Sequence, residues 1–102
     1  MNQQEIKARE EIARFGALLY SRGLAHGTAG NISVHLDDGY LVTPTNVSMG
    51  DLDPAQISKL DMDGQHVSGA KPTKEAFLHR VSYQRRPQDR AVVHLHSTHS
   101  VA

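Results

Sequence analysis

The chain has 102 residues, enough for one domain with a single modest core and too few for two. Lys and Arg together number 11, as do Asp and Glu, so the formal net charge is zero and no strong field draws the protein to nucleic acid or to an anionic membrane. The absence of cysteine excludes disulfides and thiolate ligands, so a metal site would have to be built from carboxylates and from the 7 histidines.

The sequence contains no targeting or membrane signal. Residues 1–5 lack the basic start and apolar stretch of a secretory signal, and no apolar run approaches the roughly 18 residues that span a bilayer. Aromatic residues make up only 5% of the chain, which argues against a base-stacking surface. We therefore expect a cytoplasmic protein without nucleic-acid or membrane partners, whose ligands bind at a local site.

The first predicted element is an amphipathic helix over residues 3–22. Charged residues alternate with an apolar stripe at helical spacing, and Gly23 is a natural helix end. The stripe consists of Ala8, Ile12, Phe15, Leu18 and Leu19. We interpret this segment as a packing helix without chemistry of its own.

Residues 25–31 form a turn of small residues ahead of an alternating strand over residues 32–36. An Asp-Asp-Gly hairpin signal joins this strand to a returning strand over residues 40–43. Gly30 and Asn31 leave backbone N–H groups accessible beside the strand, so the turn could cradle a phosphate. Its Gly-Thr-Ala-Gly sequence precedes a strand and is therefore neither a Walker loop nor a dinucleotide fingerprint, and an ordinary tight turn is the competing interpretation.

A second polar turn and a second hairpin follow. Residues 43–46, Thr-Pro-Thr-Asn, expose two hydroxyls and an amide together. An Asp-Pro pair typical of a helix cap predicts a short helix over residues 54–57. Strands over residues 59–62 and 65–68 flank an Asp-Gly hairpin signal, where His66 is interpreted as a solvated strand residue.

A second helix is predicted over residues 74–86, with an apolar stripe of Phe77, Leu78 and Val81. Thr73 lies at the predicted cap, so its hydroxyl, the first backbone N–H groups and the Lys74 ammonium form a candidate anion site. Glu75 falls in the first turn, where the simplest interpretation is that its carboxylate complements the helix dipole.

The last predicted strand, residues 91–96, carries a His-Leu-His sequence. Because side chains alternate along a strand, His94 and His96 share one face with Val92. Two neutral nitrogen donors side by side are what a divalent transition metal such as zinc needs from its first two ligands, although a site needs at least one more. The competing interpretation is that these histidines belong to the edge of the core.

Four motifs occur in a characteristic order: Gly-Thr-Ala-Gly-Asn-Ile-Ser, Thr-Pro-Thr, Lys-Pro-Thr-Lys-Glu and His-Leu-His. This succession closely resembles the N-terminal half of the class II aldolase/adducin family. The resemblance implies an α/β fold with a class II aldolase-like three-layer arrangement, in which helices pack on a largely antiparallel sheet. Members of the family are about twice as long, so residues 1–102 are expected to form the N-terminal part of the domain and an incomplete fold.

The resemblance also implies a site. Family members bind a divalent metal, here expected to be Zn²⁺, through the two histidines of the His-x-His strand and a third from further along the chain; the matching residues are His94 and His96. The acidic residue matches Glu75, which would be either a metal ligand or the general acid/base. The residues that match the family's phosphate-binding positions are Gly30, Asn31, Thr45, Asn46, Thr73 and Lys74.

Lys74 lies where the aldolase and epimerase branches carry serine. A cation beside a phosphate or carboxylate suits a phosphorylated sugar acid, and the sequence looks like the 3-oxo-tetronate 4-phosphate decarboxylase branch. Aldol cleavage or 4-epimerisation of a sugar phosphate is the alternative within the family, and a non-catalytic adducin-like scaffold or an inactive remnant is the alternative outside catalysis. Complete members are commonly homotetramers, so a homo-oligomer is expected.

Overall fold

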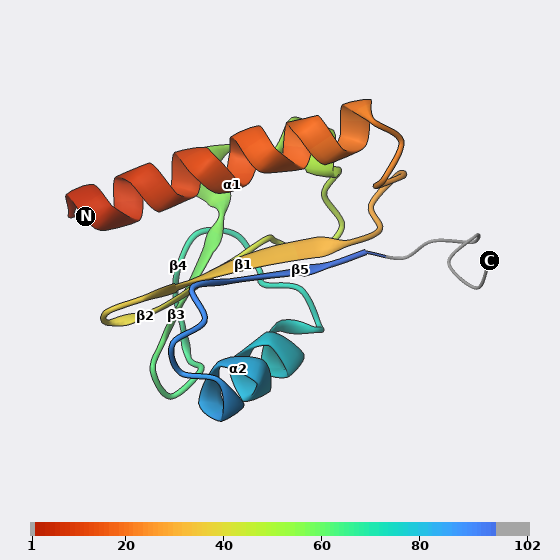
Figure 1. Ribbon diagram of the computed structural model, residues 1–102. Coiled ribbons are helices and arrows are strands. Elements are labelled where there is room, and N and C mark those ends of the chain that lie inside the picture. The colour runs from red at the N-terminus through yellow and green to blue at the C-terminus, as the bar shows by residue number, and fades with distance from the viewer. Residues whose placement is uncertain (1, 96–102) are drawn as a thin grey trace.

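An antiparallel sheet lies between two helices in the computed structural model, which describes residues 2–95 (Figure 1). One face of the sheet carries the long helix α1 and the other carries the shorter helix α2, which is the predicted three-layer arrangement. The element bounds are α1 Gln3–Ser21, β1 Asn31–Leu36, β2 Gly39–Val42, β3 Ser58–Asp61, β4 His66–Ser68, α2 Ala76–Arg85 and β5 Ala91–His94, with single 3₁₀ turns η1 Met49–Asp51 and η2 Pro54–Gln56.

The strand order is β4-β3-β2-β1-β5, and every described pair is antiparallel. Both predicted hairpins form, and at the second the Asp61 carboxylate accepts hydrogen bonds from the backbone N–H groups of Asp63 and Gln65. The last strand, β5, returns to pair with the first, with His94 opposite Asn31. This pairing places the start of β1 beside the end of β5 at one edge of the sheet.

Helix α1 begins and ends as predicted and covers one face of the sheet. The Asn2 side chain accepts a hydrogen bond of 2.8 Å from the Glu5 backbone N–H and caps the helix. The core on this face contains Ala8, Ile12, Leu19, Ala25, Ile32, Leu36, Leu41, Met49 and Ile57. No helix within residues 2–95 is long and apolar enough to span a membrane.

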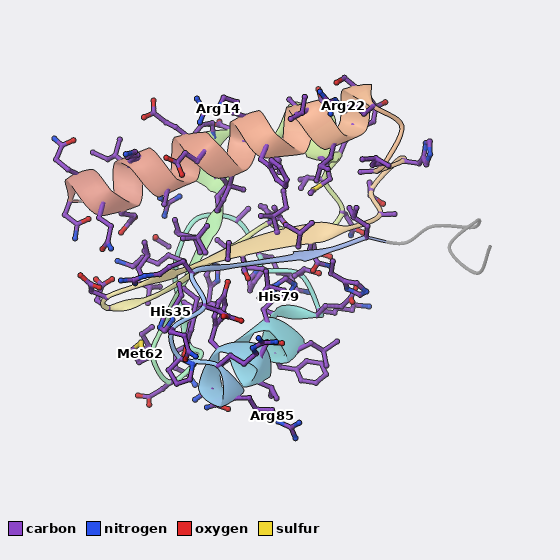
Figure 2. All side chains as sticks on the ribbon, viewed as in Figure 1. Arg14, Arg22, His35, Met62, His79 and Arg85 are labelled. Carbon is purple, nitrogen blue, oxygen red and sulfur yellow. The ribbon has the colours of Figure 1, made fainter. Side chains whose placement is uncertain are left out.

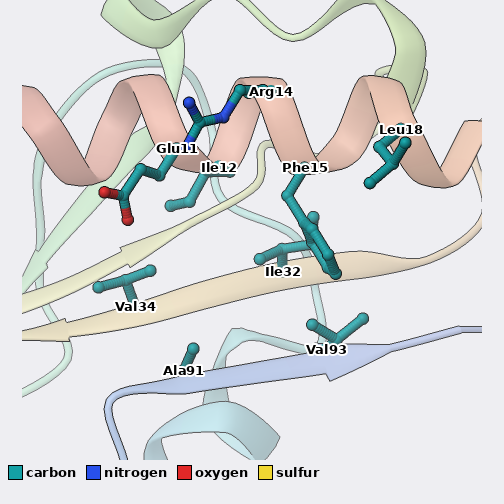
Figure 3. Close-up of a pocket in the computed structure, with 9 residues that line it drawn as sticks. All are labelled: Glu11, Ile12, Arg14, Phe15, Leu18, Ile32, Val34, Ala91 and Val93. Carbon is teal, nitrogen blue, oxygen red and sulfur yellow. The ribbon is translucent and has the colours of Figure 1, made fainter.

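The predicted apolar stripe of α1 is only partly buried. Phe15 and Leu18 are 42% and 43% exposed, and they face a groove that is bordered by side chains of β1 and of the outermost strand β5. Together with Val93 they line a groove of about 650 Å³ between α1 and the sheet edge (Figure 3). Of the predicted stripe, only Ala8, Ile12 and Leu19 are buried.

A buried charged cluster joins α1 to the sheet. Arg9 is 2% exposed, and its guanidinium donates to Glu5 Oε2 at 2.9 Å and to the backbone carbonyls of Pro54 and Ile57 at 2.9 and 2.7 Å. Lys59 on β3 donates to the other Glu5 oxygen at 2.7 Å. A pattern of helical spacing predicts that such charged side chains lie on the surface. Here they are buried or half-buried and connect α1, the segment from Pro54 to Ile57, and β3.

Helix α2 is oriented differently from the prediction. It begins at Ala76, two residues later than predicted, and the predicted apolar stripe faces outward, with Phe77 64%, Leu78 47% and Val81 42% exposed. The face that meets the sheet instead carries His79 and Tyr83, four residues apart. Tyr83 packs with Tyr40, Val42 and Leu60, and the hydrogen bonds of His79 to the sheet compensate for burying a polar ring.

Candidate active site

Glu75 and His94 meet where α2 begins and β5 ends. Glu75 is the residue immediately before α2, and His94 is the last residue of β5. Glu75 Oε2 lies 2.7 Å from His94 Nδ1, and the side chains are 29% and 41% exposed, so solutes can reach the pair. The two predicted metal ligands that the structure describes are therefore adjacent; the third, His96, lies outside the described residues.

The donor chemistry of this pair fits a divalent transition metal as a partial set. An imidazole nitrogen and a carboxylate oxygen are both common zinc ligands. Within residues 2–95 no group of three histidine or acidic side chains is arranged to hold a metal. Zinc in proteins usually has three or four ligands, so a metal at this pair would need donors besides Glu75 and His94.

Asn31 supports the Glu75 carboxylate from the sheet. It is the first residue of β1, is 2% exposed and lies opposite His94 in the strand register. Its side-chain Nδ2 donates to Glu75 Oε1 at 3.3 Å. The two carboxylate oxygens thus face different groups, Oε1 the amide of Asn31 and Oε2 the imidazole of His94.

A second histidine lies behind this group, in the layer between α2 and the sheet (Figure 2). The Nε2 atom of His79 is hydrogen-bonded to Asn31 Oδ1, and its Nδ1 lies 2.5 Å from Ser33 Oγ. Ser33 Oγ is in turn 2.7 Å from the Tyr83 hydroxyl. The hydrogen-bonded side chains therefore run without a break from Tyr83 to the Glu75–His94 pair.

Burial sets the protonation of both inner groups. It lowers the pKa of His79 below 6.5, an effect that the nearby His94 reinforces and Glu75 opposes. Burial also raises the pKa of Tyr83 to about 12. Both groups are therefore neutral near pH 7. The sequence-based prediction missed them, although the spacing Glu75, His79, Tyr83 at i, i+4, i+8 was a signal that the three share one helix face.

The predicted phosphate-binding residues lie on three segments that the backbone ties together. Thr45 N–H donates to the Lys71 carbonyl at 2.9 Å and Thr73 N–H to the Thr43 carbonyl at 3.3 Å, so the Thr-Pro-Thr turn crosses the segment before Glu75. The Thr43 hydroxyl accepts from the Ile32 N–H at 3.2 Å, which joins this crossing to the start of β1 beside Gly30 and Asn31. Lys74 and Asn46 are exposed.

Two local details differ from the sequence-based prediction. The Thr73 hydroxyl does not cap the first helical residue; it accepts from the Glu75 N–H at 3.4 Å, and the Ala76 N–H bonds to the Thr73 carbonyl at 3.1 Å. These internal bonds occupy two backbone donors that had been expected to face an anion. Asn46 has a positive φ of 58°, a conformation that asparagine tolerates better than most residues, which explains an amide at this turn.

Comparison with known proteins agrees with this arrangement. The family model described as Class II Aldolase and Adducin N-terminal domain matches residues 10–102. The chain belongs to this family. Among curated class II aldolase/adducin proteins, it is 55% identical over 98 residues to a 3-oxo-tetronate 4-phosphate decarboxylase of Cupriavidus necator, covering 96% of this chain and 45% of the relative. It is 44% identical over 80 residues to the L-fuculose phosphate aldolase of Escherichia coli, covering 78% of this chain and 37% of the relative.

A solved structure supports the fold assignment. The crystal structure of YgbL from Escherichia coli superposes with a TM-score of 0.90 at 43% identity, covering 94% of this chain and 47% of that chain. The expected class II aldolase-like fold is therefore confirmed. The chain spans about half the length of the relatives it matches.

Proposed function

We propose that this chain is the N-terminal part of a class II aldolase-type lyase that removes carbon dioxide from a phosphorylated four-carbon 3-oxo sugar acid. The observation that carries the proposal is the Glu75–His94 pair, 2.7 Å apart, beside the crossing of the Thr-Pro-Thr turn and the segment before Glu75. The similarity to a relative named 3-oxo-tetronate 4-phosphate decarboxylase supports the choice of substrate class.

We assign the metal-binding role to His94, His96 and, as ligand or neighbour, Glu75. A divalent cation bound by them, which we propose to be Zn²⁺, would act as a Lewis acid and stabilise the negative charge that develops on the substrate when the carbon–carbon bond breaks. The electron pair of that bond stays on the substrate and must be protonated. Glu75 lies at the pair and would hold or deliver this proton.

The phosphate is assigned to the three joined segments. Thr45, Asn46 and Thr73 offer hydroxyl and amide groups there, and Gly30 and Asn31 lie where β1 begins. Lys74 is exposed next to Glu75 and adds the cation that a phosphate or a substrate carboxylate requires. Binding energy from the phosphate would then orient the reacting end of the substrate.

Metal content tests the first part of the proposal. Purified, dialysed protein should contain about one zinc per chain by elemental analysis, and His94→Ala should lose it. His66→Ala is the matched control, because His66 is an exposed strand histidine elsewhere in the sheet, and it should retain the metal. Absence of metal from the unaltered chain would overturn the proposal and favour the adducin-like scaffold or inactive-remnant interpretation.

Turnover tests the second part. Metal-loaded protein should release carbon dioxide from a 3-oxo-tetronate 4-phosphate, and Lys74→Met should raise KM more than it lowers kcat, because it removes a binding charge and leaves Glu75 in place. Cleavage of a ketose 1-phosphate without decarboxylation would favour the aldolase alternative, which the similarity to L-fuculose phosphate aldolase supports. We further propose a cytoplasmic homo-oligomer, which sedimentation of the purified protein would test.

A further inference from the structure

We propose that His79 is a positioning residue: as a neutral imidazole protonated on Nε2, it fixes the Asn31 amide so that the NH₂ group faces Glu75. The inference rests on the proposed function, because only there is Glu75 assigned a role, as a metal ligand or as the group that holds or delivers a proton. Its structural content, the placement of protons and of one amide, is independent of which substrate the site takes. His79 is not a member of the Glu75–His94 pair; it acts on Glu75 indirectly, through its hydrogen bond to Asn31.

Hydrogen-bond polarity determines the tautomer. Glu75 accepts from Asn31, so the amide atom nearest Glu75 is Nδ2 and the atom bonded to His79 is the carbonyl Oδ1. A carbonyl oxygen carries no hydrogen, so the hydrogen in the second bond belongs to His79 Nε2. The neutral ring then has a lone pair on Nδ1, which accepts the hydrogen of the Ser33 hydroxyl.

The hydrogen bond between Ser33 and Tyr83, at the end of the network farthest from Glu75, has the same direction of donation. With its own hydrogen given to His79, Ser33 Oγ accepts from the Tyr83 hydroxyl. A serine hydroxyl has one hydrogen, so the hydrogen in the Ser33–Tyr83 bond comes from the tyrosine hydroxyl. Every hydrogen along the path therefore points from Tyr83 toward Glu75.

The consequence concerns the amide of Asn31, whose two ends have nearly the same shape. Reversing it would place Oδ1 against the Glu75 carboxylate, with two acceptors facing each other, and Nδ2 against His79. An N–H on His79 Nε2 makes the reversed form unfavourable at both ends. Burial favours the neutral ring that this arrangement needs, because His79 is 4% exposed and a charge there would be costly.

Two variants of similar size separate the positioning role from packing. In His79→Gln the longer side chain brings an amide NH₂ near the place of Nε2, so a donor to Asn31 remains. In His79→Asn the shorter side chain brings its polar atoms near the place of Nδ1, so it reaches Ser33 but not Asn31. Tyr83→Phe is the control at the far end of the network, where a hydroxyl is lost and His79 is retained.

The first experiment is nuclear magnetic resonance of the chain with ¹⁵N-labelled histidine, without metal. We expect His79 to be neutral with its hydrogen on Nε2 near pH 7, in the unaltered chain and in Tyr83→Phe. A hydrogen on Nδ1, or a charged ring, would overturn the proposal. This readout needs no bound metal, so it stands or falls separately from the proposed function, and it remains decisive if a His79 variant does not fold.

The second experiment measures hydrogen exchange of the Asn31 side-chain amide and the zinc affinity of the same proteins by calorimetry. Exchange should be slow in the unaltered chain and in His79→Gln, and at least about tenfold faster in His79→Asn. Zinc binding should weaken about tenfold or more in His79→Asn and less than about threefold in His79→Gln, as expected for loss of an indirect support of a ligand. Equal exchange rates in both variants would overturn the proposal, whereas absence of zinc binding in every protein would count against the proposed function alone.

Discussion

Replacing Arg9 by methionine keeps most of the aliphatic bulk of the side chain and removes the charge that joins α1 to η2 and to the Ile57 carbonyl that precedes β3. The guanidinium bonds to one carboxylate oxygen of Glu5 and to the carbonyls of Pro54 and Ile57. A buried acceptor left without its donor costs about 1–3 kcal/mol, and the Ile57 carbonyl is such an acceptor. Glu5 keeps Lys59, which limits the charge penalty.

These terms lower the free energy of unfolding by about 2–4 kcal/mol for Arg9→Met, less than the cost of a buried charge left with no partner, because Glu5 still bonds Lys59. That is a large part of the roughly 5–15 kcal/mol that stabilises a typical domain. Urea unfolding followed by circular dichroism measures it, with Arg14→Met on the exposed side of the same helix as control. The control should change stability by less than about 0.5 kcal/mol.

The reasoning also predicts non-additivity. Glu5→Gln in the Arg9→Met background should cost less than it does alone, because the carboxylate has already lost one partner. A loss below about 1 kcal/mol for Arg9→Met, or strict additivity of the two changes, would refute the account of the charged cluster.

Three further predictions concern pH and steric fit. Burial acts to raise the pKa of Glu5, but hydrogen bonds from Lys59 and Arg9 outweigh it and hold the pKa below 4.5. The ionised Glu5 therefore stabilises the fold above pH 4.5, and this stabilisation is lost as the pH falls through the lowered pKa. Glu5→Gln should accordingly flatten the acid side of a plot of stability against pH. With a pKa raised from 10.0 to about 12, Tyr83 should give one late step in an ultraviolet titration, absent in Tyr83→Phe, and its contribution to stability should decline above pH 10.0. A Cβ at Gly39 would lie 2.1 Å from the Leu60 carbonyl oxygen, so Gly39→Ala should separate β2 from β3 and cost more than about 2 kcal/mol; an unchanged urea midpoint would contradict the close approach.

Local signals in the sequence predicted most of the elements. The bounds of α1, the two hairpins and the short turn at Pro54 follow from caps, turn residues and alternation, which act within a few residues. The face of α2 that meets the sheet could not be predicted this way. The outward face of this helix carries more apolar side chains than the inward face, which presents the two polar aromatic rings of His79 and Tyr83 to the sheet. Whether a histidine is inside depends on partners such as Ser33, which is 46 residues away.

The candidate site shows the same division. The proximity of Glu75 and His94 was expected from the family resemblance, since nothing in a 19-residue separation dictates a contact. Arg9 and His79 were missed for one physical reason: each is buried by partners far along the chain, and a sequence pattern describes only neighbours along the helix. Long-range hydrogen bonding, rather than periodicity, decides these two positions.

The return of β5 to β1 also sets an order of events during folding. The β1–β2 hairpin closes over a two-residue turn, whereas the pairing of Asn31 with His94 must close most of the described chain. Such distant contacts form slowly because their loop entropy is lost before they contribute stability. We therefore expect the candidate site to assemble late, so that a ligand bound to it retards unfolding more than it accelerates folding.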